Sequence, residues 1–100
     1  MLREGDKRGF FRLLVNSDCK LTFNDHPDGP YSTDSICRDL SATGMSVELN
    51  EPIETGLTVR SQLESNNPSV PALSALGRVV RCTQESDGLY LVGIEFVEIN

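Results

Sequence analysis

The sequence has no tryptophan, one histidine and three cysteines among its 100 residues. The cysteines, Cys19, Cys37 and Cys82, are widely spaced and form no Cys-x-x-Cys pair, whereas a zinc site typically needs four closely spaced Cys or His ligands. This scarcity argues against a zinc site, and we expect no metal and no cofactor. We predict three free cysteines, each a small buried or half-buried residue in a reducing compartment.

Long apolar runs are also missing. No stretch approaches the roughly 20 residues that a membrane-spanning helix needs. The most apolar early segment, residues 10–15, is interrupted by Arg12 and is not followed by a small-residue cleavage site, so we expect no signal peptide. These absences predict a cytoplasmic protein without direct membrane insertion.

An excess of positive charge is missing as well, because the net charge is −6. This value argues against binding to a nucleic acid polymer. The charge is unevenly distributed. Residues 1–12 carry four basic and two acidic side chains, whereas residues 13–100 carry five basic and thirteen acidic ones. A local positive charge of this kind suits a small anionic ligand better than a long polyanion.

Period-two alternation of apolar and polar residues dominates the rest of the chain and indicates half-buried β-strands. The first strand is expected to start at Phe11, to end at Phe23 and to bend near Ser17. Ile36 and Leu40 are the clearest apolar residues of the second strand. The second strand is expected over residues 31–40. The four strands that follow it are expected over residues 45–49, 57–63, 73–82 and 90–96.

Turn-forming residues separate these strands. Residues 24–30 form a Pro- and Gly-containing loop in which His26 is expected to be exposed, and Asp87-Gly88 is a hairpin signal. No stretch has a helical period over ten residues. The pattern therefore predicts an all-β fold, a six-stranded antiparallel barrel or sandwich. We expect one domain, with a flexible basic arm over residues 1–9 and the β domain over residues 10–100.

Two arginines stand at the junction of the arm and the first strand, in Arg8-Gly9-Phe10-Phe11-Arg12. Guanidinium groups bind phosphate oxygens bidentately and also pair with O6 and N7 of guanine. Lys7 could add a further positive charge. Arginines four residues apart are also common on solvent-exposed surfaces, so this pattern alone is weak evidence.

The segment Asp39-Leu40-Ser41-Ala42-Thr43-Gly44 supplies complementary groups. An ionised carboxylate accepts hydrogen bonds only, so Asp39 matches the N1–H and N2–H₂ donors of guanine. The Ser41 hydroxyl can bond a phosphate or cap the turn itself. Gly44 permits positive φ and close approach of the backbone to a ligand. Any β-turn, however, favours these residue types.

Together, Arg-x-x-x-Arg before a strand, Asp-x-Ser-x-x-Gly one strand later and Gly93-Ile94-Glu95-Phe96 near the end resemble the PilZ domain family. The resemblance covers residues 7–99. It implies a six-stranded antiparallel β-barrel of PilZ type that serves as a receptor for the bacterial second messenger cyclic di-GMP. Many members continue into a C-terminal helix, which is expected to be short or absent here.

The resemblance also implies ligand-binding roles for individual residues. Arg8 and Arg12 match the arginines that hold phosphates and guanine edges, and Lys7 lies where many members have another basic residue. Asp39, Ser41 and Gly44 match the second motif. Arg81 occupies a position where many members have an aromatic residue, so it either stacks on a guanine face or is simply exposed to solvent.

The resulting functional prediction is a cyclic di-GMP receptor in second-messenger signalling. The ligand is expected to order the N-terminal arm against the turn at residues 39–44, and an unidentified downstream protein reads the change. The alternative is a PilZ-fold protein–protein adaptor that does not bind the nucleotide. No enzyme and no catalytic residue are expected, because Asp39 and Ser41 lack a recognisable base and His26 has no nucleophile pattern nearby.

Overall fold

The chain folds into six β-strands in the computed structural model, which describes residues 12–27, 29–64 and 72–99, and only the backbone for residues 12–15. The strands are β1 (Arg12–Phe23), β2 (Tyr31–Ser41), β3 (Gly44–Leu49), β4 (Thr58–Leu63), β5 (Leu73–Ser86) and β6 (Leu89–Ile99). The described residues contain no helix. The expected arm at residues 1–9, which includes Lys7 and Arg8, lies outside the described residues.

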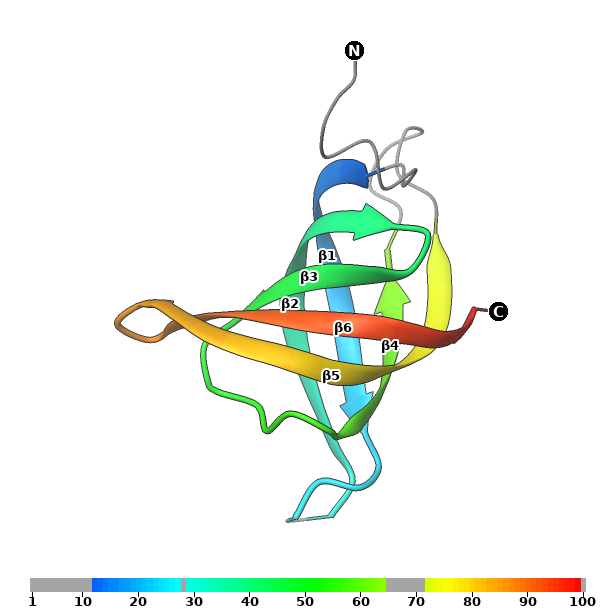
Figure 1. Ribbon diagram of the computed structural model, residues 1–100. Helices are drawn as coiled ribbons and strands as arrows, with labels where there is room; N and C mark the ends of the chain where they lie inside the picture. The colour runs from blue at the N-terminus through cyan, green and yellow to red at the C-terminus, as the bar shows by residue number, and fades with distance from the viewer. Residues whose placement is uncertain (1–11, 28, 65–71, 100) are drawn as a thin grey trace.

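The six strands form a closed barrel in the order β1-β2-β3-β6-β5-β4, with β4 pairing back to β1. All six pairings are antiparallel. In Figure 1, β3, β6 and β5 cross the front of the barrel, and β1 lies behind them. The predicted fold class, a six-stranded antiparallel barrel, is confirmed.

Alternation within the strands places the apolar side chains inside the barrel. On β1, Cys19, Leu21 and Phe23 are buried while the intervening Asp18 and Lys20 are exposed. Closure of the sheet lets every strand contribute such an inner face to one core. The core is completed by residues of the other strands, including Cys37, Leu40, Met45, Val47, Leu49, Val59, Leu63, Val79, Val92 and Ile94.

The β5–β6 hairpin is longer than the sequence pattern indicated. β5 continues four residues beyond Cys82 to Ser86, and β6 begins at Leu89 directly after the turn. The turn is Asp87-Gly88, as predicted, and Gly88 has a φ of 72°, which glycine adopts without a Cβ clash. Figure 1 shows this hairpin extending well beyond the body of the barrel. Side chains near its tip are exposed, which is why their alternation is weak in the sequence.

His26 is half-buried, so the expectation of an exposed loop histidine is wrong. Its ring centroid lies 4.7 Å from that of Tyr31 and 6.5 Å from that of Phe23. Phe23 ends β1 and Tyr31 begins β2, so the rings at the two strand ends that flank the loop cover part of the histidine.

All three cysteines are free thiols: Cys19 and Cys37 are buried and Cys82 is half-buried, as predicted. Across the part of the chain that the structure describes, no helix of sufficient length and hydropathy to cross a membrane is found.

Candidate functional site

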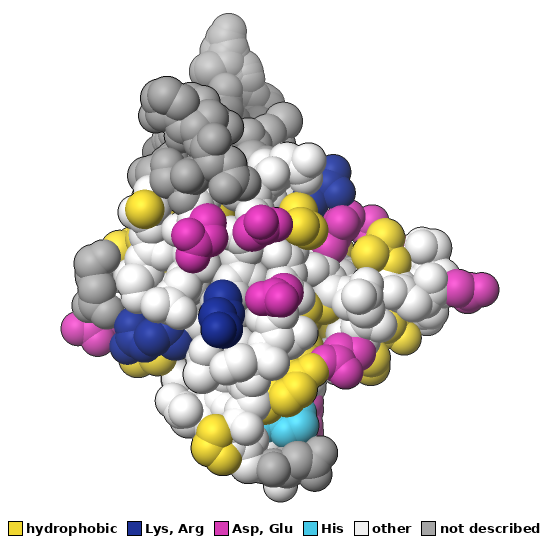
Figure 2. All heavy atoms as spheres, turned by 180° about the vertical axis from the view of Figure 1, so that it is seen from behind, with side chains coloured by type: hydrophobic (Ala, Val, Ile, Leu, Met, Phe, Trp, Pro, Cys, Tyr) yellow, Lys and Arg dark blue, Asp and Glu magenta, His cyan; other side chains and the backbone are white. Residues whose placement is uncertain are grey.

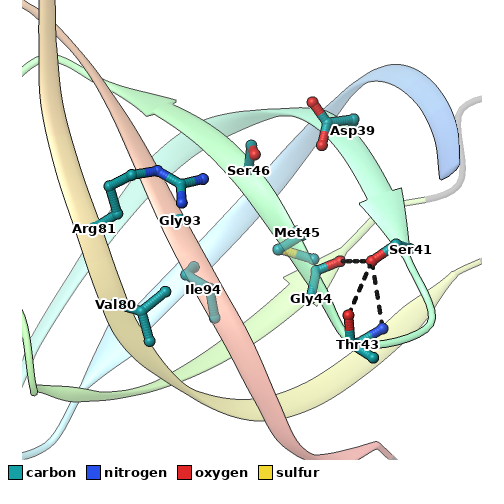
Figure 3. Close-up of a pocket in the computed structure, with 10 residues that line it drawn as sticks. All are labelled: Asp39, Ser41, Thr43, Gly44, Met45, Ser46, Val80, Arg81, Gly93 and Ile94. Atoms are coloured by element: carbon teal, nitrogen blue, oxygen red, sulfur yellow. Dashed lines mark hydrogen bonds between the residues drawn. The ribbon is translucent and has the colours of Figure 1, made fainter. Parts of the chain in front are cut away.

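Four residues from four neighbouring strands lie in one row across the outer face of the barrel. Asp39 of β2 pairs with Ser46 of β3. Ser46 pairs in turn with Gly93 of β6, and Gly93 pairs with Arg81 of β5. Neighbouring strands in a sheet lie about 4.8 Å apart. The strand that carries Asp39 (β2) and the strand that carries Arg81 (β5) are therefore about 14 Å apart along the row. Figure 3 shows the Arg81 side chain extending along this row toward Ser46.

A β-bulge in β2 places Asp39 in this row. Cys37 pairs with Val47, but the next residue of β3, Ser46, pairs with Asp39, so Arg38 is the extra residue. Strict alternation would put Asp39 on the same inner face as Cys37. With the bulge, Leu40 is buried instead, and Asp39 faces outward and is half-buried.

A second bulge, in β5, acts on Arg81 in the same way. Val79 pairs with Ile94 and Arg81 with Gly93, which leaves Val80 as the extra residue. Val79 is buried and Val80 is 47% exposed, yet Arg81 is exposed as well. Two bulges on strands that are not neighbours therefore bring an acidic and a basic side chain to one outer surface. Bulges often re-aim side chains in this manner next to functional sites.

The row forms the floor of a shallow pocket with a volume of about 140 Å³. Pockets for drug-sized ligands span about 300–1,000 Å³, so this pocket is smaller than a site that encloses a whole ligand of that size. The lining residues are Asp39, Ser41, Thr43, Gly44, Met45, Ser46, Val80, Arg81, Gly93 and Ile94 (Figure 3).

The Ser41 hydroxyl caps the turn between β2 and β3. Its Oγ accepts a hydrogen bond from the Thr43 N–H at 3.3 Å and donates one to the Gly44 carbonyl at 3.3 Å. The turn is also tied to β6, because the Phe96 N–H donates to the Thr43 carbonyl at 2.8 Å. Of the two roles that the sequence left open for Ser41, the structure contains the capping role, and it places the hydroxyl at the pocket wall.

Gly44 does not have positive φ, so the conformational reason given for it from the sequence is wrong. The reason for glycine is space. A Cβ at this position would lie closer than 3.0 Å to the Ile94 carbonyl oxygen and 3.4 Å from the Glu95 Cα. The close backbone approach is therefore to β6, which lets β3 and β6 pair directly beneath the pocket.

Arg12 begins β1, and its backbone pairs with that of Ser41. Two residues further along β1, Leu14 pairs with Asp39. The β1–β2 ladder thus brings the second arginine of the Arg-x-x-x-Arg motif next to the turn at residues 39–44. Arg8 and Lys7 lie outside the described residues, so their predicted roles stay predictions.

A buried thiol supports the bulge beneath Asp39. The Cys37 Sγ–H donates to the Asp39 carbonyl at 3.5 Å. Burial raises the pKa of the Cys37 thiol to about 12, with smaller contributions from Cys19 and Asp39, so the thiol stays protonated. The bulged residue itself is held elsewhere, because Arg38 Nη1 lies 2.6 Å from Glu48 Oε2.

A larger hollow elsewhere on the barrel is unsuited to an anion. It has a volume of about 300 Å³ and is lined by Asp18, Cys19, Lys20, Asp34 and Glu64. Three carboxylates against one ammonium repel negative charge. Figure 2, the view from behind Figure 1, shows acidic side chains gathered around a basic one on this side of the molecule. No group of three or more potential metal ligands is present within residues 12–27, 29–64 and 72–99.

Sequence reasoning missed Ser46 and Gly93 as site residues. Ser46 was interpreted only as a polar position of a strand, and Gly93 only as part of the Gly93-Ile94-Glu95-Phe96 motif. The available signal was weak, because their places in the row depend on two bulges. Bulges change which residues share a face, and alternation of hydrophobicity alone does not locate them.

Comparison with known proteins agrees with this architecture. The family model described as PilZ domain matches residues 6–100. The solved structure of the Bacillus subtilis inhibitor of motility, MotI/DgrA, is similar to this chain with a TM-score of 0.70 and 14% sequence identity. The similarity covers 100% of this chain and 45% of that one, so this chain spans less than half the length of MotI/DgrA. At this identity the similarity concerns the fold alone. No curated protein sequence matches the chain.

Proposed function

Because this chain belongs to the PilZ domain family, whose model matches residues 6–100, we propose that it is a receptor for cyclic di-GMP. Domains of this family are generally binding modules for that nucleotide. The observation that carries the proposal for this chain is the outward row from Asp39 to Arg81, which presents a hydrogen-bond acceptor and a flat cation to one small pocket.

The two ends of the row suit different parts of guanine. The Asp39 carboxylate accepts hydrogen bonds from N1–H and N2–H₂, a pair of donors that adenine lacks on its corresponding edge. A charge-assisted hydrogen bond of this kind contributes about 1.5–3 kcal/mol. The size of the pocket, about 140 Å³, fits one base, so the rest of the dinucleotide lies outside this pocket.

The Arg-x-x-x-Arg motif supplies the phosphate contacts. Arg12 starts the strand that runs beside the turn, and its backbone lies opposite Ser41. Guanidinium groups bind phosphate oxygens bidentately, so Arg12 and Arg8 neutralise the ligand's charge while Asp39 selects the base. Binding orders residues 1–9, with Lys7 and Arg8, against the turn, and a downstream protein reads the altered surface.

Isothermal titration calorimetry with cyclic di-GMP tests the proposal. We expect saturable binding by the wild type and a loss of about 2 kcal/mol, roughly thirtyfold in Kd, for Asp39→Ala. Asp34→Ala is the matched control, because Asp34 is an exposed aspartate on the outer face of the same strand and outside this pocket. Arg12→Ala should also weaken binding, and cyclic di-AMP should bind much less tightly. Absence of heat with the wild type would overturn the proposal.

Catalysis is not part of the proposed function. After prolonged incubation with the protein, cyclic di-GMP should elute unchanged from a nucleotide column, whereas a linear dinucleotide product would contradict this statement.

The second candidate is an adaptor that acts through protein contacts without nucleotide. The similarity in fold to a protein titled an inhibitor of motility favours keeping this candidate, since that title describes an effect on another system. An NMR spectrum unchanged by excess cyclic di-GMP, together with a reproducible partner in a pull-down, would favour the adaptor over the receptor.

A further inference from the structure

Gly93 lies in the middle of β6, on the outer face, yet it is buried. Glycine in a strand interior costs stability because its backbone loses more entropy on folding than that of other residues. Positive φ does not explain this glycine, since its φ is not in the left-handed region. Its presence therefore has another cause.

The space above Gly93 is taken by the Arg81 side chain. A Cβ built on Gly93 would lie 3.0 Å from Nη2 and 3.2 Å from Cζ of Arg81, which are atoms of the guanidinium group. Figure 3 shows the same arrangement, with the guanidinium lying across β6 rather than extending away from the barrel. Arg81 thus buries Gly93, and Gly93 lets Arg81 lie against the strand.

On this basis we infer that Gly93 is a positioning residue that holds the Arg81 guanidinium as a flat cationic shelf for one purine base of the ligand. The inference rests on the proposed function and names the device that receives the base. The face of the guanidinium turned away from β6 is open to the pocket. Arginine planes stack on bases and attract their π-electrons.

The neighbours of the shelf suit a base that lies over it. Ser46, the next residue in the row, has a small side chain that leaves the pocket open between Arg81 and Asp39. Val80, which is 47% exposed, adds an apolar side chain to the lining of the same pocket. A base stacked on Arg81 therefore lies in the same row as Asp39, with Ser46 between them.

A double-mutant cycle tests the inference, using calorimetric titration with cyclic di-GMP. Arg81→Ala should weaken binding about tenfold, the loss expected when one base loses its stacking partner. Gly93→Ala should weaken binding about threefold to tenfold by displacing the guanidinium, and it should have no further effect in the Arg81→Ala background. Arg81→Lys should behave like Arg81→Ala, because lysine keeps the charge but lacks the plane, and Arg78→Ala should bind like the wild type.

A ligand-free measurement separates this inference from the proposed function. In the NMR spectrum of the free protein, the Arg81 Nε–Hε signal should shift in Gly93→Ala, while the Arg78 signal and the melting temperature should change little. If Gly93→Ala weakens binding equally with and without Arg81, or if Arg81→Ala binds like the wild type, the inference is wrong while the receptor proposal stands. If the wild type binds no cyclic di-GMP, both fall. An unmoved Arg81 signal in Gly93→Ala would overturn the positioning role by itself.

Discussion

Replacing Gly44 with alanine tests whether this residue of the second motif is structural. The added Cβ would lie closer than 3.0 Å to the Ile94 carbonyl oxygen and 3.3 Å from the Ile94 carbonyl carbon. These atoms belong to the backbone of the neighbouring strand, so no side chain can rotate away. β3 and β6 must separate instead, and their ladder begins at this position with the pairing of Gly44 and Glu95.

The expected cost is at the upper end of the range for overpacking, about 3 kcal/mol, because the clash is with backbone. For a domain of this size, a loss of 3 kcal/mol lowers the melting temperature by about 15 °C. Urea unfolding followed by far-ultraviolet circular dichroism measures the free energy directly, and it suits a chain without tryptophan.

Gly93→Ala is the matched control for this experiment. Its new Cβ also meets close neighbours, but they belong to the movable Arg81 side chain. We therefore expect the free energy of unfolding of Gly93→Ala to stay within about 0.5 kcal/mol of the wild type. The reasoning would be refuted if Gly44→Ala were as stable as the wild type, or if the two variants lost the same amount.

Three further predictions concern single residues. Ser61→Ala should stabilise the protein by about 1 kcal/mol in urea unfolding, because the Ser61 Oγ is buried without a hydrogen-bond partner in the described part of the chain; a lower stability would contradict this. Ser41→Ala should cost about 0.5–1 kcal/mol of stability in urea unfolding, because its hydrogen bonds in the turn are lost. The same variant should also weaken cyclic di-GMP binding in a calorimetric titration at a temperature where it is folded, and unchanged affinity would contradict a role of this turn in binding. Burial raises the pKa of Cys19 from 9.0 to about 11 and that of Cys37 to about 12, so the unfolded state loses these protons at lower pH than the folded state. The stability that these thiols provide is fully present below pH 9 and is lost as the pH rises toward 12. In urea unfolding measured across this pH range, Cys37→Ala should show a shallower fall in the free energy of unfolding than the wild type. An equally steep fall in the variant would rule out the Cys37 thiol as its cause.

The strand pattern could be predicted from the sequence because closure of the barrel gives each strand one apolar face. Leu21, Phe23 and Val47 sit at alternating positions and are fully buried, which is the arrangement that the period of two indicates. On β2 the expected strand is present and Leu40 is buried, but Ile36 is only half-buried and Cys37 is buried in its place. Ile36 and Leu40 do not share a face, because the bulge at Arg38 changes the alternation between them.

The candidate site could be predicted in part. The pairing of Arg12 with Ser41 follows from the order of the strands, so the sequence was sufficient to expect the two motifs close together. The contributions of Ser46 and Gly93 could not be predicted, since their places in the row require the register of three strand pairs and two bulges. Gly44 illustrates a third case, in which the residue was correctly placed in the turn but its physical reason, contact with β6, lies 50 residues further along the chain.

The central claim is that the outer row from Asp39 to Arg81 receives cyclic di-GMP, and an NMR titration of the ¹⁵N-labelled protein tests it most directly. The account predicts saturable shifts of the backbone amides of Asp39, Ser46, Gly93 and Arg81, with those of Asp18 and Asp34 at the acidic hollow unchanged. A spectrum without shifts, or shifts confined to the acidic hollow, would contradict it.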